Sequence, residues 1–465
     1  MTVAILPIAV LIVALTILKL PAWKAALSAF VVGAVEAFFF CGLSAHALAD
    51  CAARGVSTGL FPIGLVIIAA LFMYSITVES GAIGDIKAGL ASLSDDRCFM
   101  ALLVAWGFGN FMEGMAGFGT AVAIPCAILV GVGFDPMKAV LCCLVANTTP
   151  TAFGSVGVPT MVLSSETALG VSPLSAQIAF LQLLPTALSP FLILFITDGW
   201  RGVREKFALA VVADVAFLVP WVAVAATLGC ELPDIVGGIV AMGAFAAMGR
   251  RGALDLRRQM WAWMPFAFVV VVLALGSILA SFGMKRISPG FLILAAAFAG
   301  GLAQKLSLPR LVRLLFGTVR KYALALLTIC LVLALARTMG ESGMTTTLAE
   351  SLVKVSGKGY PFISGLVGAL GGFMTGSGTS SNVLFGMLQA SVGSVEAEKL
   401  LYAAANVMGA GIGKMVCPQS IVLGCAAAGL AGRESEAMRK AFPFFVAVLA
   451  LATASVVAFS AVISR

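Results

Sequence analysis

The feature that most constrains this chain is a succession of apolar stretches, each long enough to cross a bilayer, that recurs throughout the sequence. A membrane-spanning helix needs about 20 predominantly apolar residues. Of the 465 residues, 61% are hydrophobic and only 11% are charged, whereas soluble domains carry roughly 25% charged residues. Since every backbone N–H and C=O in lipid must be bonded internally, the pattern predicts an all-α polytopic membrane protein.

About 12 of these stretches are long enough to be predicted as full crossings. The first lacks the basic leading region and the small-residue cleavage site of a secretory signal, so we expect it to be retained as a helix. The predicted crossings are 3–20, 25–43, 59–79, 137–163, 175–198, 206–229, 232–249, 261–281, 287–304, 322–340, 397–430 and 441–462.

Two further apolar stretches, 98–133 and 360–392, have a different pattern. Each is short for two crossings, and each is interrupted in its middle by a glycine-rich polar segment. The interruptions are GNFMEGMAGFGT at 109–120 and GGFMTGSGTSSN at 371–382. We therefore expect each stretch to be a re-entrant hairpin that enters and leaves the membrane on the same face.

The distribution of lysine and arginine supports this topology. If both stretches are hairpins, a large majority of the loop lysines and arginines fall on one face, whereas two single crossings give a weaker bias. The positive-inside rule favours the stronger bias and assigns that face to the cytoplasm. Both termini are then predicted to lie outside. The net charge of +8 is explained by these loops, so no nucleic-acid partner is expected.

The two halves of the sequence resemble each other. Glu79-Ser80-Gly81 recurs as Glu341-Ser342-Gly343, and the same offset aligns 111–114 with 373–376. An odd number of crossings separates the matching segments, which predicts inverted-topology repeats, an arrangement typical of secondary transporters. The predicted parts are a first repeat at 1–205, with hairpin 98–133 and broken helix 137–163; linking helices at 206–250; and a second repeat at 251–465, with hairpin 360–392 and broken helix 397–430.

Polar residues gather at four predicted helix breaks, namely the two hairpin tips and the segments 147–159 and 406–418. Irregular backbone at membrane depth is tolerated only inside protein or beside a watery cavity, and exposed helix N-termini favour anions. Glycine and proline permit such breaks. The predicted hinges are Gly109, Gly114, Gly117, Gly119, Gly371, Gly376, Gly378, Gly411, Gly413, Pro159 and Pro418.

The hydroxyl and amide side chains at these breaks suit a ligand that bears a carboxylate and a hydroxyl. The alternative for each is hydrogen bonding between helices, which is common for Ser and Thr in membranes. The candidates are Thr120, Asn147, Thr148, Thr149, Ser155, Thr375, Ser377, Thr379, Ser380, Ser381, Asn382, Asn406, Gln419 and Ser420.

Two ionisable residues are embedded at the breaks, Glu113 at the first tip and Lys414 in the last break. Charges at membrane depth are costly and usually face a cavity or a partner. We expect Lys414 to attract a substrate carboxylate and Glu113 to carry a coupled proton. The alternative is a purely structural ion pair between them. The roles of three other embedded residues, Glu36, Asp214 and Arg337, stay open.

No catalytic or cofactor-binding pattern accompanies these residues. The ten cysteines lie mostly in apolar runs without a CxxC pair, and HExxH and GxSxG are absent, so we expect no metal, no cofactor and no enzyme activity. Three alternatives to proton-coupled transport remain. They are a sodium-coupled carrier of mono- or dicarboxylates, with Na⁺ held by carbonyls at the breaks; a membrane-embedded enzyme acting on lipid-linked substrates; and a channel.

Four motifs carry a resemblance to the L-lactate permease family. They are Met112-Glu113-Gly114-Met115-Ala116-Gly117-Phe118-Gly119; Asn147-Thr148 followed by Ala152-Phe153-Gly154; Thr375-Gly376-Ser377 followed by Thr379-Ser380-Ser381-Asn382 and Leu384-Phe385-Gly386; and Gly413-Lys414-Met415 followed by Pro418-Gln419-Ser420. The sequence departs from the pattern at Gly378, where we expect Asn or Asp.

The resemblance implies proton-coupled uptake of lactate or glycolate across the bacterial cytoplasmic (inner) membrane. It also implies kinship with the wider ion-transporter superfamily, whose members move a hairpin-bearing domain against a scaffold like an elevator. On that picture, residues 98–163 and 360–430 form the moving part. Elevator carriers are commonly dimers, so a homodimer is among the assemblies that the analogy allows.

Overall fold

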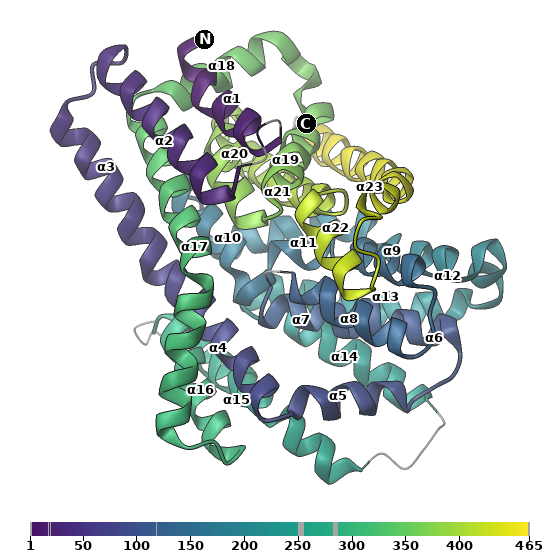
Figure 1. Ribbon diagram of the computed structural model, residues 1–465. Helices are drawn as coiled ribbons and strands as arrows, with labels where there is room; N and C mark the ends of the chain where they lie inside the picture. Colours follow the sequence, from purple (N-terminus) through teal and green to yellow (C-terminus); the bar gives the residue numbers. More distant parts are fainter. Residues whose placement is uncertain are drawn as a thin grey trace.

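A computed structural model of the chain describes residues 2–16, 18, 20–117, 119–249, 255–281 and 287–463. Within those ranges every regular element is a helix, which confirms the predicted all-α class. Figure 1 shows two groups of helices. One runs from the top of the view down its left side and along its lower part, and the other forms the centre and right.

Eight helices in the described residues are long and apolar enough to cross a membrane, and a bent helix pair makes a ninth. The predicted number of about twelve is therefore not confirmed. Segments 137–163, 232–249 and 287–304 form helices shorter than 18 residues, and parts of 3–20 lie outside the described residues. The candidate spans are Ala22–Phe39, Ala45–Glu79, Arg97–Met115, Val171–Glu205, Phe207–Thr227, Arg257–Gly276, Leu308–Glu341 and Glu434–Ile463, with Glu396–Lys414 and Pro418–Ala427 bent by 41°.

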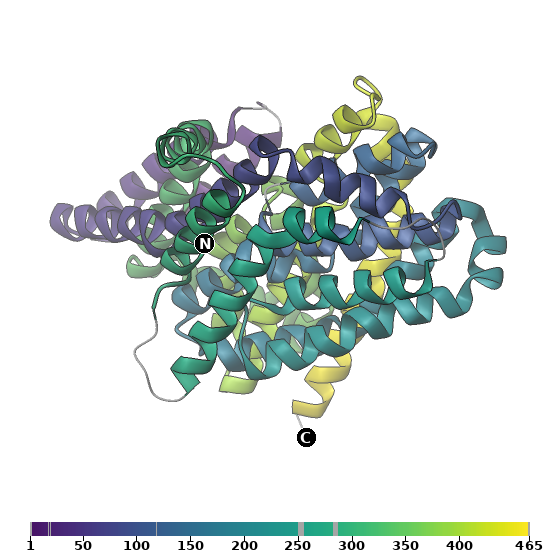
Figure 2. The ribbon, with the colours of Figure 1, turned by 90° about the horizontal axis from the view of Figure 1, so that it is seen from below.

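The first group is built around the long helix α17, beside which α2 and α3 lie, while α1 packs on α2 (Figures 1 and 2). Gly55 of α3 allows close packing, because a Cβ there would lie 2.5 Å from the backbone of Ala334. The helices of this group are α1 (Thr2–Thr16), α2 (Ala22–Phe39), α3 (Ala45–Thr58), α4 (Leu65–Glu79), α5 (Ala82–Ala91), α15 (Leu256–Ser281), α16 (Pro289–Ala303), α17 (Leu308–Glu341) and α18 (Met344–Ser356).

The predicted crossing at 59–79 begins too late. A π-helical segment, Gly59–Gly64, joins α3 to α4 with a kink at Phe61, so the helical stretch starts at Ala45. The sequence of α3 is more polar and was not recognised as helical. It forms a helix because its apolar face packs along α17.

The second group contains both stretches that the sequence predicts as re-entrant hairpins, 98–133 and 360–392, and their re-entrant course stays a prediction. Its helices are α6 (Arg97–Ala101), η2 (Leu102–Phe108), α7 (Gly109–Met115), α8 (Thr120–Gly131), α9 (Pro136–Ala146), η3 (Pro150–Ala152), α10 (Gly154–Thr167), α11 (Val171–Ala187), α12 (Ser189–Glu205), α13 (Phe207–Thr227), α14 (Pro233–Met248), α19 (Tyr360–Thr375), α20 (Gly378–Val392), α21 (Glu396–Lys414), α22 (Pro418–Ala427) and α23 (Glu434–Ile463), with the short η4 (Gly357–Gly359) leading into α19.

Helices α19 and α21 pack closely along each other. A Cβ at Gly372 would lie 2.0 Å from the carbonyl oxygen of Ala410, and one at Gly413 would lie 2.0 Å from that of Ala369. Small residues that let backbones approach are the usual basis of helix packing in membranes. These glycines therefore fix one arm of the second hairpin against α21.

Equivalent turns follow α4 and α17. Gly81 has φ +80° before α5, and Gly343 has φ +76° before α18. Both are left-handed positions that glycine adopts without strain. The repeated Glu-Ser-Gly triplets thus form the same local structure, while the predicted inverted relation of the two halves stays a prediction.

Candidate functional site

The first hairpin breaks between α7 and α8, as predicted for its glycine-rich tip. Gly117 and Gly119 have φ of +59° and +83°. Two hydrogen bonds hold the tip: the hydroxyl of Thr120 donates to the Gly117 carbonyl oxygen at 2.8 Å, and that of Ser155 donates to the Ala116 carbonyl oxygen at 3.0 Å. The tip is therefore tied to the start of α10.

The second hairpin breaks between α19 and α20. Gly376 is left-handed, with φ +64°. The Ser377 hydroxyl accepts a hydrogen bond from the Ser380 amide at 3.3 Å and caps α20, while Thr375 Oγ1 donates to the Ser377 carbonyl oxygen at 3.0 Å. Serine at this position satisfies a free amide of the helix end, so these hydroxyls shape the second tip.

The break between α9 and α10 contains a left-handed turn. Ser155, Val156 and Gly157 have φ of 48°, 58° and 77°. A left-handed conformation costs a non-glycine residue roughly 1–2 kcal/mol, and valine is β-branched. Such strain gathers at ligand sites, where the surrounding structure maintains it. The irregular backbone predicted for 147–159 is present.

The predicted break at 406–418 is wrong in extent. Helix α21 continues to Lys414, and only Met415–Cys417 separate it from α22. Asn406, Gly411 and Gly413 consequently lie in regular helix. The two glycines serve packing, because a Cβ at Gly411 would lie 2.3 Å from the Thr148 carbonyl oxygen. Gly109, Gly114 and Gly371 are likewise helical.

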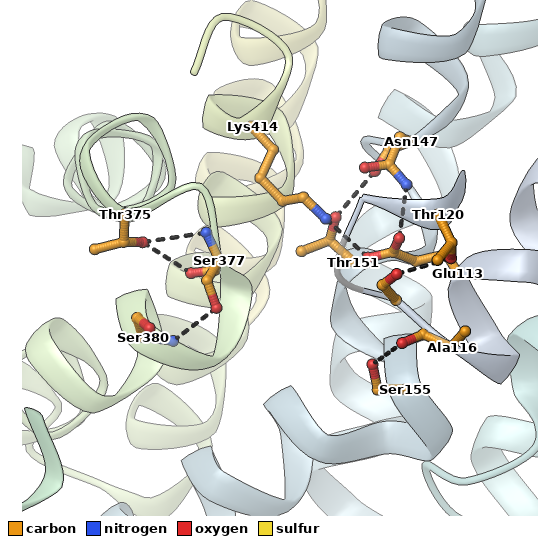
Figure 3. A network of polar contacts seen from close by, with 11 residues as sticks. Glu113, Ala116, Thr120, Asn147, Thr151, Ser155, Thr375, Ser377, Ser380 and Lys414 are labelled. Atoms are coloured by element: carbon orange, nitrogen blue, oxygen red, sulfur yellow. Dashed lines mark hydrogen bonds and ion pairs between the residues drawn. The ribbon is translucent and has the colours of Figure 1, made fainter. Parts of the chain in front are cut away.

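Lys414 and Glu113 form a buried ion pair at the meeting point of these breaks. Lys414 Nζ lies 2.8 Å from Glu113 Oε1, and the side chains are 8% and 5% exposed. Asn147 Nδ2 donates to the other carboxylate oxygen, Oε2, at 3.0 Å. Figure 3 shows the lysine extending between the two tips toward Glu113. Each charge thus neutralises the other in a site from which water is largely excluded.

A small cavity of about 60 Å³ adjoins this pair. It has room for a few water molecules, since one water needs about 10–15 Å³ of such space. The cavity touches the N-terminal ends of two helices, α8 at Gly119 and α20 at Gly378. Its walls are Glu113, Gly119, Thr151, Gly154, Ser155, Pro159, Gly376, Ser377, Gly378, Thr379 and Lys414.

The predicted polar residues divide into three sets. Some line the cavity, namely Glu113, Ser155, Ser377, Thr379 and Lys414. Others form the hydrogen bonds already described beside the cavity: Thr120, Asn147 and Thr375 through their side chains, and Ser380 through its backbone amide. The remainder do not reach it: Thr148 and Thr149 line a separate small pocket with Gln182, Gln419 and Pro418 are exposed, and Ser381, Asn382, Asn406 and Ser420 are buried outside its walls.

Asn382 and Asn406 belong to a buried side-chain network. The Asn406 amide donates to Asn382 Oδ1 at 2.9 Å, and Asn382 in turn donates to the Pro159 carbonyl oxygen at 2.9 Å. At the other end, Gln389 donates to Asn406 Oδ1 at 3.1 Å and accepts from the Tyr360 hydroxyl at 2.7 Å. These bonds join the second hairpin to α21 and α10.

Three residues near the site were not predicted. Thr151 and Gly154 line the cavity, and their positions within the 147–159 break could have indicated them. Asp234 of α14 is 1% exposed and accepts a hydrogen bond from Trp221 Nε1 at 2.8 Å. A Cβ at Gly114 would lie 2.7 Å from Asp234 Cβ, so this carboxyl backs the first hairpin. The sequence signal for Asp234 was the presence of an acidic residue near the start of the predicted crossing at 232–249.

The other embedded ionisable residues lie elsewhere. Arg337 of α17 pairs with Glu166 of α10 at 3.2 Å, an ion pair between the two groups of helices. Glu36 and Asp214 are buried. Among the described residues, no group of three or more His, Cys, Asp or Glu side chains could hold a metal ion.

Known proteins resemble this chain over most of its length. The family model described as L-lactate permease matches residues 1–282 and 270–463. The L-lactate permease of Streptococcus iniae is 36% identical, covering 72% of this chain and 78% of its own. Glycolate permease GlcA of Escherichia coli K12 is 32% identical, covering 94% and 91%. The L-lactate permease of Bacillus subtilis 168 is also 32% identical, with the same coverage.

The fold of this chain is also found among solved structures. The YdaH transporter of Alcanivorax borkumensis superposes with a TM-score of 0.53, covering 89% of each chain at 14% identity. At this identity the likeness concerns the path of the backbone alone.

Proposed function

The chain belongs to the L-lactate permease family, and from that premise we propose that it imports a small 2-hydroxy monocarboxylate, lactate or glycolate, by proton symport. Membership makes it a multi-pass membrane permease, which moves its substrate and does not convert it. The observation that carries the proposal is the buried Lys414–Glu113 pair beside the cavity between the two hairpin tips.

Charge balance at this pair supports coupling to a proton. In the empty site, Lys414 and Glu113 neutralise each other. A substrate carboxylate that binds Lys414 displaces Glu113, which becomes neutral only by taking up a proton. Empty and fully loaded sites are then both neutral. A site holding substrate alone or proton alone retains an uncompensated charge, and burying one is costly. Movement of the site is therefore permitted only with both ligands or with neither.

The rest of the cavity suits the remainder of a 2-hydroxy acid. Helix N-termini carry partial positive charge and free amides, so the start of α20 at Gly378 and Thr379 can share the carboxylate with Lys414. The hydroxyls of Thr151, Ser155 and Thr379 line the same space. They are placed to hydrogen-bond a substrate hydroxyl on the neighbouring carbon, which a simple carboxylate lacks.

Transport requires the site to open alternately to the two sides. We propose that the hairpins are re-entrant, that the two halves are inverted repeats, and that residues 98–163 and 360–430 move together against a scaffold that includes α17. Two observations support this. Glycine-mediated contacts join α19 to α21, and the Asn382–Asn406 network ties α20 to α21 and α10. A homodimer in the cytoplasmic membrane, with both termini outside, completes the proposal.

Uptake into proteoliposomes tests the function. Purified protein is reconstituted, and accumulation of labelled lactate is measured with an inwardly directed proton gradient in choline buffer free of Na⁺. We expect accumulation that an uncoupler abolishes, with glycolate competing and succinate not competing. Accumulation that required Na⁺, or stronger competition by the dicarboxylate, would instead favour a sodium-coupled carrier. Electrogenic, non-saturable flux would indicate a channel.

A further inference from the structure

A groove lined by basic side chains lies between α4 and α17, away from the Lys414–Glu113 pair. The groove has a volume of about 730 Å³. Helix α17 contributes Arg310, Arg313 and Lys321, and α4 contributes Ser75 and Glu79. Arg310 Nε donates to Glu79 Oε1 at 2.8 Å, which ties the end of α4 to the beginning of α17. The groove is thus held open between two fixed walls.

The groove carries excess positive charge. Glu79 neutralises Arg310, whereas Arg313 and Lys321 are exposed and have no acidic partner within the described part of the chain. Residues three and four apart share one helix face, so all three basic residues and Gly317 point the same way. Gly317 leaves room between them, because a Cβ there would meet no atom within 4 Å. Two cationic side chains are therefore available to an anion.

The length of α17 indicates where this groove lies relative to the membrane. At 1.5 Å per residue, its 34 residues span about 51 Å, which exceeds the roughly 30 Å of hydrocarbon core. Its apolar part, predicted to cross at 322–340, leaves the basic first turns to project into the headgroup layer. Lys321 lies 5.3 Å from the ring centroid of Tyr322, and tyrosine is enriched at that interface. The positive-inside rule assigns this end to the cytoplasmic leaflet.

We propose that this groove binds the phosphodiester headgroup of an anionic phospholipid of the cytoplasmic leaflet. Basic pockets between membrane helices on this side suit such headgroups, and the guanidinium of Arg313 matches phosphate oxygens in two-point contact. Tyr74 lies on the opposite wall and can hydrogen-bond the glycerol part. The Ser75 hydroxyl already donates to the Leu71 carbonyl oxygen at 2.8 Å and accepts from Thr318 at 3.2 Å. The lipid would bridge α4 and α17. The site does not depend on the proposed transport function.

Native mass spectrometry of the intact protein in detergent tests the proposal. Phosphatidylglycerol, phosphatidylcholine and inorganic phosphate are titrated separately, with wild-type protein and with Arg313→Gln, Arg313→Gln/Lys321→Gln and Arg204→Gln. Arg204 is the matched control, since it is exposed near the end of α12 and is predicted to face the cytoplasm. We expect phosphatidylglycerol to be retained, with affinity about five-fold lower for each groove charge removed and unchanged in the control.

Three results would overturn the proposal. Equal weakening by Arg204→Gln would mean that only general surface charge matters. Equal retention of phosphatidylcholine would exclude recognition of an anionic headgroup. Saturation by inorganic phosphate at the concentrations that suffice for the lipid would indicate a site for a free anion. Melting temperatures in lipid-free detergent, expected to be equal for all variants, distinguish a lost site from a misfolded protein.

Discussion

Replacing Glu113 by glutamine should slow the return of the empty site while leaving the movement of the loaded site largely intact. The substitution keeps the size of the side chain and an oxygen that can accept from Lys414, but it removes the negative charge. The fully loaded site stays neutral, because the substrate carboxylate compensates Lys414 and glutamine resembles protonated glutamate. The empty site acquires one unpaired positive charge. The variant should therefore exchange substrate but fail to return empty.

The size of the effect follows from the burial of the pair, in which both side chains are less than one-tenth exposed. Removing one partner of a buried ion pair costs roughly 3–5 kcal/mol. At about 1.4 kcal/mol per factor of ten, the empty site would reorient on the order of 10² to 4 × 10³-fold more slowly. The residual glutamine oxygen places the expected value toward the lower end. Counterflow, which needs only the loaded site, should stay within about ten-fold of wild type.

Both processes are measured in the same proteoliposomes. Net uptake of labelled lactate is followed with an inward proton gradient at several external pH values, and counterflow is followed in vesicles preloaded with unlabelled lactate. Wild-type net uptake should increase as the external pH falls, because the proton is a co-substrate in the proposed cycle. The variant should show strongly reduced net uptake with no pH dependence. Net accumulation that still followed the proton gradient, or parallel loss of counterflow and net uptake, would refute this assignment of Glu113.

Three other substitutions test separate parts of the site. Lys414→Met should abolish counterflow as well as net uptake, because the substrate carboxylate then has no cation; counterflow within about ten-fold of wild type would contradict this. Asn406→Ala should lower the melting temperature with little change in KM, because Gln389 and Asn382 each lose a hydrogen-bond partner at a cost of about 1–3 kcal/mol in stability. A large rise in KM at unchanged stability would instead make Asn406 a substrate ligand. Gly372→Ala should destabilise the protein by about 1–3 kcal/mol because its Cβ would overlap α21, whereas Gly365→Ala on the same helix, whose Cβ meets only Leu449 Cδ1 at 4.0 Å, should melt near the wild-type temperature.

Apolar patterning was sufficient to predict most of the helices. The helix over Ala45–Thr58 was missed because its residues are only partly apolar, and its conformation depends on packing against α17, which lies far away in the sequence. The predicted crossing at 137–163 is interrupted for a different reason. Apolarity continues across the break between α9 and α10, whereas the left-handed turn at 155–157 is set by tertiary contacts.

The charged part of the site could be predicted because embedded charges are rare and need partners. Glu113 and Lys414 are indeed partners, although they are far apart in the sequence. The roles of Asn382 and Asn406 were not predictable in the same way, because an amide suits both a ligand and a neighbouring helix. Only the positions of Gln389 and Tyr360 show that the two asparagines belong to a closed network. Glycines had the same ambiguity, since Gly413 serves close packing and Gly376 serves a turn.

The alignment of the two halves explains why one site bears a single ion pair. The offset of 262 residues places Thr375 opposite Glu113. A second offset of 259 residues, which aligns Ala146-Asn147 with Ala405-Asn406, places Ser155 opposite Lys414, so each charged position has a hydroxyl counterpart. Ser155 and Lys414 both reach the first tip, at Ala116 and Glu113 respectively. A fully symmetric site would accept a small anion equally well in two orientations. The charges occupy one member of each matched pair and hydroxyls occupy the other. In the proposed mechanism, a carboxylate and the hydroxyl beside it would therefore have distinct places, and the anion would bind in one orientation.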